Sequence, residues 1–294
     1  MENIKEYISK KRPSLSKSSL TTYGSILKNL YKNVYGGDDY DLSKFQYPSQ
    51  TLKYLDGIPP NRRKTILSAL VIITDNKDYR DLMLKDVRDY NADIQKQEKT
   101  ETQQESWVEK NAVNEIFSDL KKNADAIMKK QKYTLSDLQE IQNYIIIALL
   151  GGIFISPRRS KDFCDFKIRN IDVSKDNYMD KNKFIFNSYK TAKTYGKQDV
   201  DIPVKLKNII AKWIKINPTE YLLFDANMNK LSAVKLNQRL NKIFDGKKVG
   251  VNQLRHTYLT DKFADSIKRE KVIKDTMEDM GSSKEMLKTY VKKD

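Results

Sequence analysis

The chain has 294 residues, enough for two ordinary domains that each bury a core. Hydrophobic residues make up 39% and charged residues 32%, the balance of a soluble globular protein. The longest apolar run, residues 144–155, is shorter than the roughly 20 residues of a membrane span and contains two glycines, which excludes an integral membrane protein.

Cysteine and histidine occur once each, as Cys164 and His256. A structural zinc site needs about four such ligands, so the sequence excludes one, together with any internal disulfide. The charged N-terminus, residues 1–11, lacks the apolar segment of a signal peptide, and we expect a cytoplasmic or nuclear protein. The net charge of +16 fits nucleic-acid binding through phosphate contacts and equally fits a lysine-rich solvated surface.

The first third predicts a small basic bundle of about four short helices. One helix runs from about residue 20 to 34, with Ser14 or Ser16 as its cap and Gly36-Gly37 at its end. A second begins after Pro59-Pro60 with Asn61 as cap, and a third spans about 78–93. The inward positions are Ile66, Leu67, Leu70 and Ile73 on the second and Tyr79, Leu82, Met83, Val87 and Tyr90 on the third; the basic residues are Lys11, Arg12, Arg62, Arg63 and Lys64.

Residues 95–105 contain no apolar side chain, so this stretch is a linker or an exposed helix end. We therefore place a helical domain at 1–94, a linker at 95–106 and a second domain at 107–294. The second part predicts helices at 111–130 and 136–150, then strands at 183–189 and 198–204 joined by a basic turn, Lys190 to Lys197. Further helices are expected at 204–216, 232–244, 252–267 and 270–280. The expected fold class is mainly α with a small antiparallel β-sheet.

Joining DNA strands without a metal requires a nucleophile, fixed cations for the charge on phosphorus and an acid for the departing 5′ oxygen. Arginine suits the second task because its planar guanidinium grips two phosphate oxygens and keeps its charge. The segment Gly151 to Phe163 resembles the first-arginine motif of the tyrosine recombinases, the phage integrase family. In that motif an acid and an apolar residue follow the arginine, as Asp162 and Phe163 follow Arg159, with Arg158 as the alternate. The acid would orient the arginine; otherwise the segment is a basic helix start.

The segment Asn252 to Thr260 resembles the most recognisable stretch of the family, a helix start of the form His-x-Leu-Arg-His. The resemblance makes Arg255 the second catalytic arginine and His256 its supporting neighbour, whereas a lone histidine is more often a packing residue. Positions 252, 255 and 256 share one face of a helix and could meet one phosphate.

The turn Lys190-Thr-Ala-Lys193 stands where the family carries its catalytic lysine. We expect Lys190 as the general acid with Lys193 second, or else a hairpin tip that only touches phosphate. Met280-Gly-Ser282-Ser followed by Tyr290 resembles the Leu-Gly-His ending before the family's tyrosine nucleophile. Tyr258 is the competing tyrosine, in a position that the family fills with a packing aromatic.

The chain departs from the family at two positions. Asn252 replaces a histidine and cannot accept a proton at neutral pH, and Ser282 stands where histidine or tryptophan is usual. Tyrosine has a pKa of about 10, so neighbouring arginines or His256 would have to assist Tyr290. Few residues follow Tyr290, so contacts between protomers would need another element, such as the tyrosine helix crossing over.

The resemblance implies a site-specific recombinase or integrase that acts as a tetramer on double-stranded DNA through a 3′-phosphotyrosine, with no cofactor. The resemblance covers about residues 107–294, which it makes the catalytic domain, with residues 1–94 as a DNA-binding domain ahead of it. Within the family, the chain is similar to viral or mobile-element members. The alternatives are a type IB topoisomerase, a catalytically weak or inactive DNA-binding protein of the same fold, and a helical adaptor with a basic surface.

Overall fold

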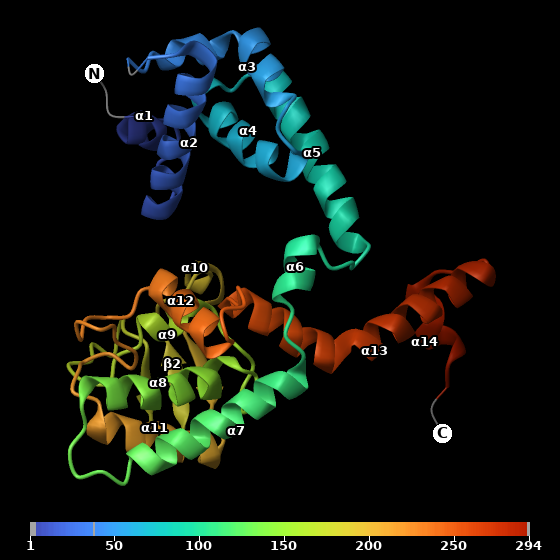
Figure 1. Cartoon of the computed structure of the whole chain (residues 1–294). Coiled ribbons are helices and arrows are strands. Elements are labelled where there is room, and N and C mark those ends of the chain that lie inside the picture. The colour runs from blue at the N-terminus through green and yellow to red at the C-terminus, as the bar shows by residue number, and fades with distance from the viewer. Residues whose placement is uncertain (1–3, 38, 293–294) are drawn as a thin grey trace. The chain divides into compact units, whose positions relative to one another are not determined.

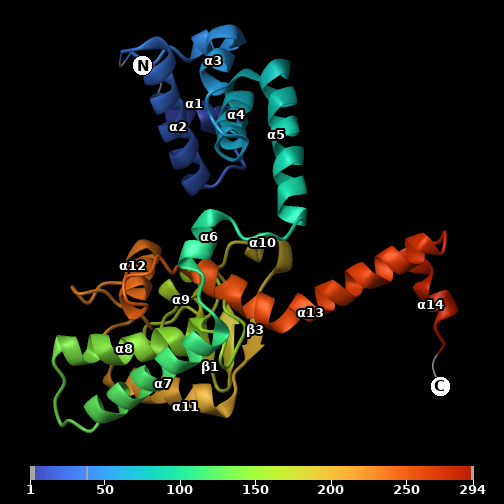
Figure 2. The same cartoon turned by 45° about the vertical axis from the view of Figure 1, so that its right-hand side comes forward.

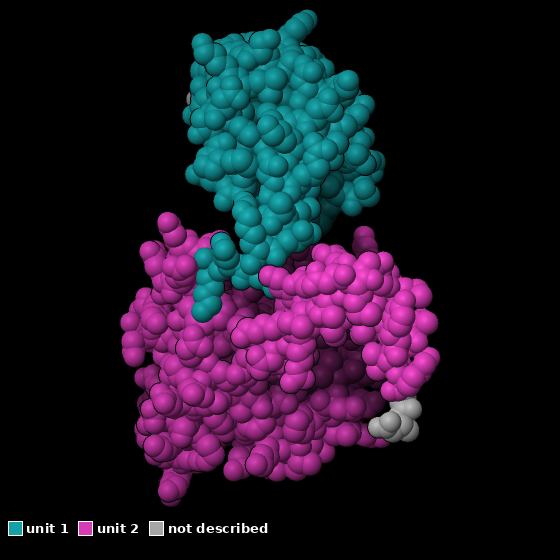
Figure 3. All heavy atoms as spheres, turned by 90° about the vertical axis from the view of Figure 1, so that its right-hand side faces the viewer, with its two compact units in different colours: residues 1–99 teal, residues 100–294 magenta. Residues whose placement is uncertain are grey.

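The structure, a computed structural model, describes residues 4–37 and 39–292. It is mostly helical with one three-stranded antiparallel sheet, which confirms the expected fold class (Figure 1). The chain divides between Lys99 and Thr100 into two compact units, coloured teal and magenta in Figure 3. Within the described residues, no helix combines the length and the apolar character that crossing a bilayer requires.

Unit 1 is a helical bundle around a core of its own. Its elements are α1 Ile4–Lys11, α2 Lys17–Tyr35, the 3-10 helix η1 Leu42–Gln46, α3 Pro48–Leu55, α4 Pro60–Thr74 and α5 Lys77–Gln95. The predicted first helix is confirmed as α2: Ser16 caps it by accepting the backbone N–H of Ser19, and Gly36 ends it at φ 75°. α4 packs against α1, α2 and α5 and buries Leu67, Leu70 and Ile73.

Three details of the predicted bundle are wrong. Pro60 occupies the first turn of α4 and Pro59 caps it, because proline suits a position where no N–H donor is needed; Asn61 is not the cap. Tyr90 is exposed. Arg63 does not add to the basic surface, because its Nε and Nη2 each donate to the fully buried carboxylate of Asp86 at 2.8 Å. This ion pair fastens α4 to α5.

The segment around residues 95–106 contains a short helix. α5 ends at Gln95, and α6 spans Glu101–Ser106. Thr100 and Gln103 form a reciprocal capping box at the start of α6, which explains how six polar residues hold a helical turn without an apolar face.

Unit 2 continues with α7 Lys110–Ile127, α8 Leu135–Leu150, α9 Ser160–Cys164, β1 Tyr178–Asp180, β2 Lys183–Phe186, α10 Ala192–Tyr195, β3 Gln198–Asp201, α11 Val204–Ile216, α12 Ala233–Ile243, α13 Val251–Asp279, η2 Lys284–Met286 and α14 Leu287–Tyr290. α8 packs against both α7 and α11 and is apolar all round from Ile145 to Leu150, as a helix at the centre of a core must be. The helices predicted at 111–130, 136–150, 204–216 and 232–244 are confirmed to within a few residues.

The sheet is an antiparallel meander in the order β1, β2, β3. Its register places Phe186 opposite Gln198 and Phe184 opposite Val200. Both predicted strands form, although they are shorter than expected, and β1 was not predicted. The basic turn between β2 and β3 closes when the hydroxyl of Tyr189 donates to the carbonyl of Gly196 at 2.7 Å.

The two helices predicted at 252–267 and 270–280 are one continuous helix, α13. Its first two turns bury Val251, Leu254 and Thr257 in unit 2, whereas most later residues are exposed. Figures 1 and 2 both show α13 leaving the rest of the unit with α14 near its far end. We call residues 100–258 the body and residues 259–292 the arm.

Candidate active site

An open pocket of about 700 Å³ lies on the body. Its walls come from the segment before α9, from the β2–β3 hairpin and from the first turns of α13. The residues that line it are Ile155, Ser156, Pro157, Arg158, Arg159, Asp162, Tyr189, Thr191, Tyr195, Gln198, Val200, Asp201 and Arg255. Three arginines from two distant parts of the sequence therefore face one cavity.

Arg158 is held in place by two hydrogen bonds and an aromatic ring. Its Nε donates to Asp162 at 2.9 Å, and its Nη1 donates to the side-chain oxygen of Gln198 at 3.0 Å. Its guanidinium carbon lies 3.9 Å from the ring centre of Phe186. We call these three partners the seat of Arg158. Phe186 and Gln198 are opposite each other in the register of β2 and β3, so the pairing of the two strands places both beside the guanidinium. Arg158 thus ties α9 to the hairpin.

Asp162 is almost completely buried in the pocket wall. Burial raises the pKa of its carboxyl group, and the charge and hydrogen bond of Arg158 and the charge of Arg159 oppose that rise. Its Oδ1 atom has no hydrogen-bond partner among the described residues. The carboxylate pairs with Arg158, four positions earlier, whereas the sequence motif led us to expect it to orient Arg159.

Arg159 and Arg255 are the two uncommitted cations of the pocket. In residues 4–37 and 39–292, neither guanidinium takes part in a hydrogen bond or ion pair, and both are half-buried. The backbone of Arg159 caps α9, and Arg255 lies in the second turn of α13. An anion such as a phosphate could therefore take donors from both arginines without breaking an existing contact.

The hairpin lysines lie beside the pocket and do not line it. Lys190 is exposed between two lining residues, Tyr189 and Thr191, and Lys193 is exposed on α10. Both ammonium groups are on a short turn held by the Tyr189–Gly196 hydrogen bond. The hairpin position expected for a catalytic lysine is thus next to the arginines, with the lysine side chains in solvent.

Asn252 and His256 are both exposed on the first turns of α13, and neither lines the pocket. His256 does not pack in the core, and the sequence alternative of a buried packing histidine does not describe it. The buried side of the same turns is taken by Gln253, Leu254 and Thr257. Only Arg255 of the predicted face reaches the cavity.

Tyr290 lies at the end of the arm, away from the pocket. Its side chain is 57% exposed, and α14 contacts η2, which packs back on α13. Glu270 and Lys284 form an ion pair that fixes η2 near position 270 of α13, about 20 Å further along the helix than Arg255. Ser282 is in the turn between α13 and η2, where its N–H donates to the carbonyl of Met277 at 2.8 Å. The structure does not bring Tyr290 and Ser282 to the arginines of the same chain.

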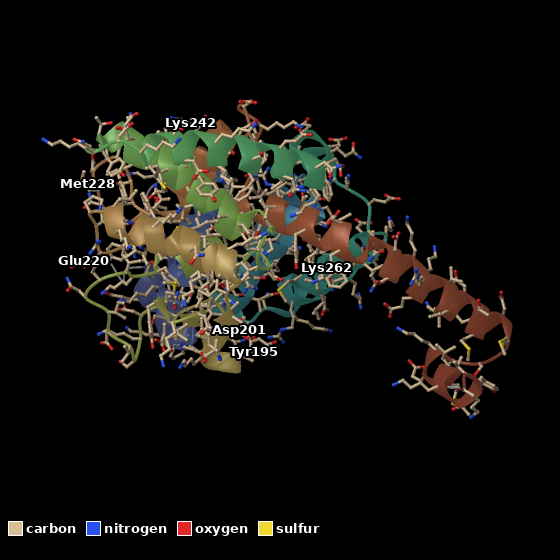
Figure 4. All side chains as sticks on the ribbon, turned by 90° about the horizontal axis from the view of Figure 1, so that it is seen from below. Tyr195, Asp201, Glu220, Met228, Lys242 and Lys262 are labelled. Carbon is tan, nitrogen blue, oxygen red and sulfur yellow. The ribbon has the colours of Figure 1, made fainter. Side chains whose placement is uncertain are left out.

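Several lining residues carried no clear signal in the sequence. Gln198 and Tyr189 seat Arg158, and Tyr195 and Asp201 line the hairpin side of the pocket; Figure 4 labels the last two, with Lys262 on α13. Gln198 could have been found from the sequence as the polar residue that pairs with Phe186 across the two predicted strands. Identifying that pair requires the strand register, which the sequence leaves uncertain by one or two residues.

No described group of three or more His, Cys, Asp or Glu side chains is arranged to hold a metal ion. Cys164 is buried, and burial raises the pKa of its thiol to about 12, so at neutral pH it is an unreactive core residue.

No family model matches the sequence, and no curated protein matches it. Among solved structures, the chain is similar to the XerH site-specific recombinase bound to its difH substrate in a pre-cleavage complex. The sequence identity is 16%, the TM-score is 0.39, and the match covers 89% of this chain and 84% of that one. This likeness is too distant to transfer residues or activity from that protein.

Proposed function

We propose that this chain cleaves and rejoins double-stranded DNA as a site-specific recombinase or integrase of the tyrosine recombinase type. The observation that carries the proposal is the pocket in which the uncommitted guanidiniums of Arg159 and Arg255 face the same space beside the seated Arg158. The sequence motifs that suggested these arginines are far apart in the chain, so their meeting in one cavity is independent support.

The pocket suits a phosphodiester because Arg159 and Arg255 can bind its two non-bridging oxygens, where charge builds up during in-line attack. In the reaction, the exposed phenol of Tyr290 loses its proton to water, and its oxygen forms a bond to phosphorus while the bond to the 5′ oxygen breaks. The reverse attack by a 5′ hydroxyl rejoins the strand. Lys190 and Lys193 would bring positive charge from the hairpin, and Asn252, His256 and Ser282 would contact neighbouring phosphates or the tyrosine.

The position of Tyr290 leads us to propose that it serves the pocket of a second copy of the chain. The arm carries the phenol outward, and its helix exposes apolar side chains at four-residue spacing, Leu259, Phe263 and Ile267. Such a stripe on one helical face is suited to packing against another subunit. A tetramer on two duplexes would give each pocket a tyrosine from a neighbour.

Double-stranded DNA as the partner fits the net charge of +16 and the exposed Lys11, Arg12 and Arg62 of unit 1. Binding through phosphate contacts releases counterions, so the affinity should fall steeply as salt rises.

The test is covalent trapping on a pool of nicked duplexes of randomised sequence, so that a departed strand cannot be rejoined. Wild-type protein should yield an adduct that survives denaturation, and peptide mapping should find the nucleotide on Tyr290. Tyr290→Phe should yield none. Tyr133→Phe is the matched control, because it also removes one phenol hydroxyl, which donates to the carbonyl of Met128 outside the pocket lining. An equal adduct from Tyr290→Phe would defeat the assignment.

A DNA-binding protein with weak or no cleavage is the second candidate. It is favoured by Asn252 and Ser282 at positions where the family has proton-transferring or ring side chains, and by the distance between Tyr290 and its own pocket. Tight, salt-sensitive binding without any adduct would support it. Relaxation of supercoiled plasmid by a monomer without site preference would instead indicate a type IB topoisomerase.

A further inference from the structure

A chain of three polar side chains runs from solvent to the wall of the arginine pocket. Lys262 Nζ donates to the phenol oxygen of Tyr258 at 3.2 Å, and that oxygen lies 3.0 Å from the hydroxyl of Ser156. Ser156 lines the pocket, and Lys262 is exposed on α13. Tyr258 is three positions after Arg255, so both project from the same side of that helix.

The segment that carries Ser156 is fastened to Tyr258 by close packing. Gly152 has φ +67°, and a Cβ atom there would lie 2.4 Å from Cδ2 of the Tyr258 ring, so a side chain at this position would displace the ring. Lys110 Nζ donates to the carbonyls of Gly151 and Gly152 at 2.9 and 2.8 Å. The Tyr258 phenol and the Ser156 hydroxyl therefore keep a fixed distance, because the segment before Ser156 packs directly against the Tyr258 ring on α13.

The direction of the hydrogen bonds follows from the chemistry of the groups. An ammonium can only donate, so Tyr258 accepts from Lys262 and is free to give its own proton to Ser156. Ser156 can then point its proton into the pocket. The hydrogen bond to Ser156, followed by the hydrogen bond and charge of Lys262 and the charge of Lys110, lowers the pKa of Tyr258 against the effect of burial.

The proposed cleavage leaves one chemical need unassigned within the pocket lining. The departing 5′ oxygen becomes a strongly basic alkoxide unless a proton reaches it as its bond to phosphorus breaks. The arginines do not supply that proton because their pKa is too high, and Lys190, the expected acid, does not line the pocket. A serine hydroxyl is an equally weak acid by itself, so it can donate only where a stronger acid replaces its proton in the same step, as Tyr258 can for Ser156.

We propose that Ser156 is the proton donor to the 5′ oxygen and that Tyr258 and Lys262 are positioning residues that resupply it. This rests on the proposed strand cleavage. As the P–O5′ bond breaks, the Ser156 proton forms the new O5′–H bond, the Tyr258 proton passes to Ser156, and a Lys262 proton passes to Tyr258. Lys262 ends neutral and regains its proton from water.

The experiment compares two nicked substrates that differ in one atom, the bridging 5′ oxygen or a sulfur in its place. A thiol has a pKa of about 8.5, so a thiolate departs without a proton donor. Tyr258→Phe interrupts the chain with the ring retained, and adduct formation on the oxygen substrate should fall about 100-fold. On the sulfur substrate it should stay within about threefold of wild type, since only the lost proton transfer is bypassed.

Ser156→Ala should behave in the same way, and Ser156→Thr, which keeps a hydroxyl, should restore the oxygen substrate. Tyr133→Phe is the control for loss of a phenol hydrogen bond elsewhere in the unit. Equal losses on both substrates would show a merely structural role for Tyr258 and overturn the proposal, as would sulfur rescue confined to Lys190→Ala. An adduct lost in Tyr258→Phe on both substrates but kept in Tyr290→Phe would make Tyr258 the nucleophile and overturn both assignments. Wild-type protein inert toward both substrates would reject the cleavage function itself, and the proton chain with it.

Discussion

The body and the arm of unit 2 place charged and aromatic groups in opposite ways. In the body, Arg158 is fixed by a carboxylate, an amide and an aromatic ring, and this seat leaves Arg159 and Arg255 facing an open pocket. In the arm, Tyr290 sits on a four-residue helix at the end of a long exposed one. The body thus holds charged groups in fixed positions, whereas the arm exposes a phenol at the end of a long helix.

Under the proposed function, this difference separates the cations that one chain places in its pocket from the tyrosine that we propose a second copy supplies. Cation placement needs burial and a strand register, both of which the body has. If Tyr290 is the nucleophile, its delivery requires either a large movement of α13 or a second copy, because α14 lies near the far end of α13 and Arg255 is in the second turn of that helix. The arm holds itself together locally: Met277 is buried, and the N–H of Ser282 donates to the carbonyl of Met277.

The largest expected effect comes from mixing two inactive variants. Arg255→Ala lacks a pocket cation and Tyr290→Phe lacks the proposed nucleophile, so each alone should form at least about 1000-fold less adduct than wild type. If the arm serves a neighbour, the mixture should recover adduct to within about tenfold of wild type, because an intact pocket meets an intact tyrosine. The adduct would be measured on the nicked pool. A mixture as inactive as its components would show that each arm returns to its own pocket.

Arg158 and Arg159 should separate stability from activity within the body. Arg158→Ala leaves the buried Asp162 without its partner and should lower the free energy of unfolding by about 3–5 kcal/mol. Arg159→Ala breaks no hydrogen bond or ion pair among the described residues and removes only a neighbouring charge from Asp162, so it should lower the melting temperature much less than Arg158→Ala while adduct formation falls about 100-fold. Thermal melts and adduct yields measure the two quantities. The opposite assignment, with Arg159 stabilising and Arg158 essential only for adduct, would contradict the described seat.

The start of α8 offers a pH test of the body. Hydrogen bonds from Lys130 and from the backbone and hydroxyl of Thr134 lower the pKa of Asp137 to about 2. Because its pKa is lower in the folded state, the ionised Asp137 stabilises the folded protein at pH values above its unfolded-state pKa of about 3.9. This contribution is lost as the pH falls toward 2. Asp137→Asn should therefore melt below wild type at pH 7, and the gap should close between about pH 4 and pH 2. A gap independent of pH would exclude the ionised cap as its cause.

The smallest effect is expected in the arm. Glu270 and Lys284 are both well exposed, so Glu270→Gln should leave the melting temperature of the protein unchanged. It should slightly raise amide hydrogen exchange in residues 284–290 at low salt and not at high salt, where the charges are screened. Exchange measured by mass spectrometry on peptides from this segment provides the check. A clear loss of global stability would mean that the arm is part of the folded core.

The local pattern of apolar residues was sufficient to predict most of the helices and strands. The apolar rhythm of α2, the continuous apolar run of α8 and the alternation of β2 each gave the element within a few residues, because periodicity reports burial directly. The predicted break in α13 was wrong, because a helix can remain continuous through polar residues when no proline or glycine stops it. Arg63 was expected on the surface because its buried partner, Asp86, is on a different helix.

By itself the sequence determined the helical class, the small sheet and the arginine segments that face the pocket, since these follow from residue type and spacing. Only the tertiary structure decided which arginine is seated and which is free, that Tyr258 rather than Tyr290 stands beside the pocket of its own chain, and that Ser156 connects that phenol to the cavity. Those outcomes depend on strand register and on the path of α13, and both are set by packing between segments that are distant in the chain.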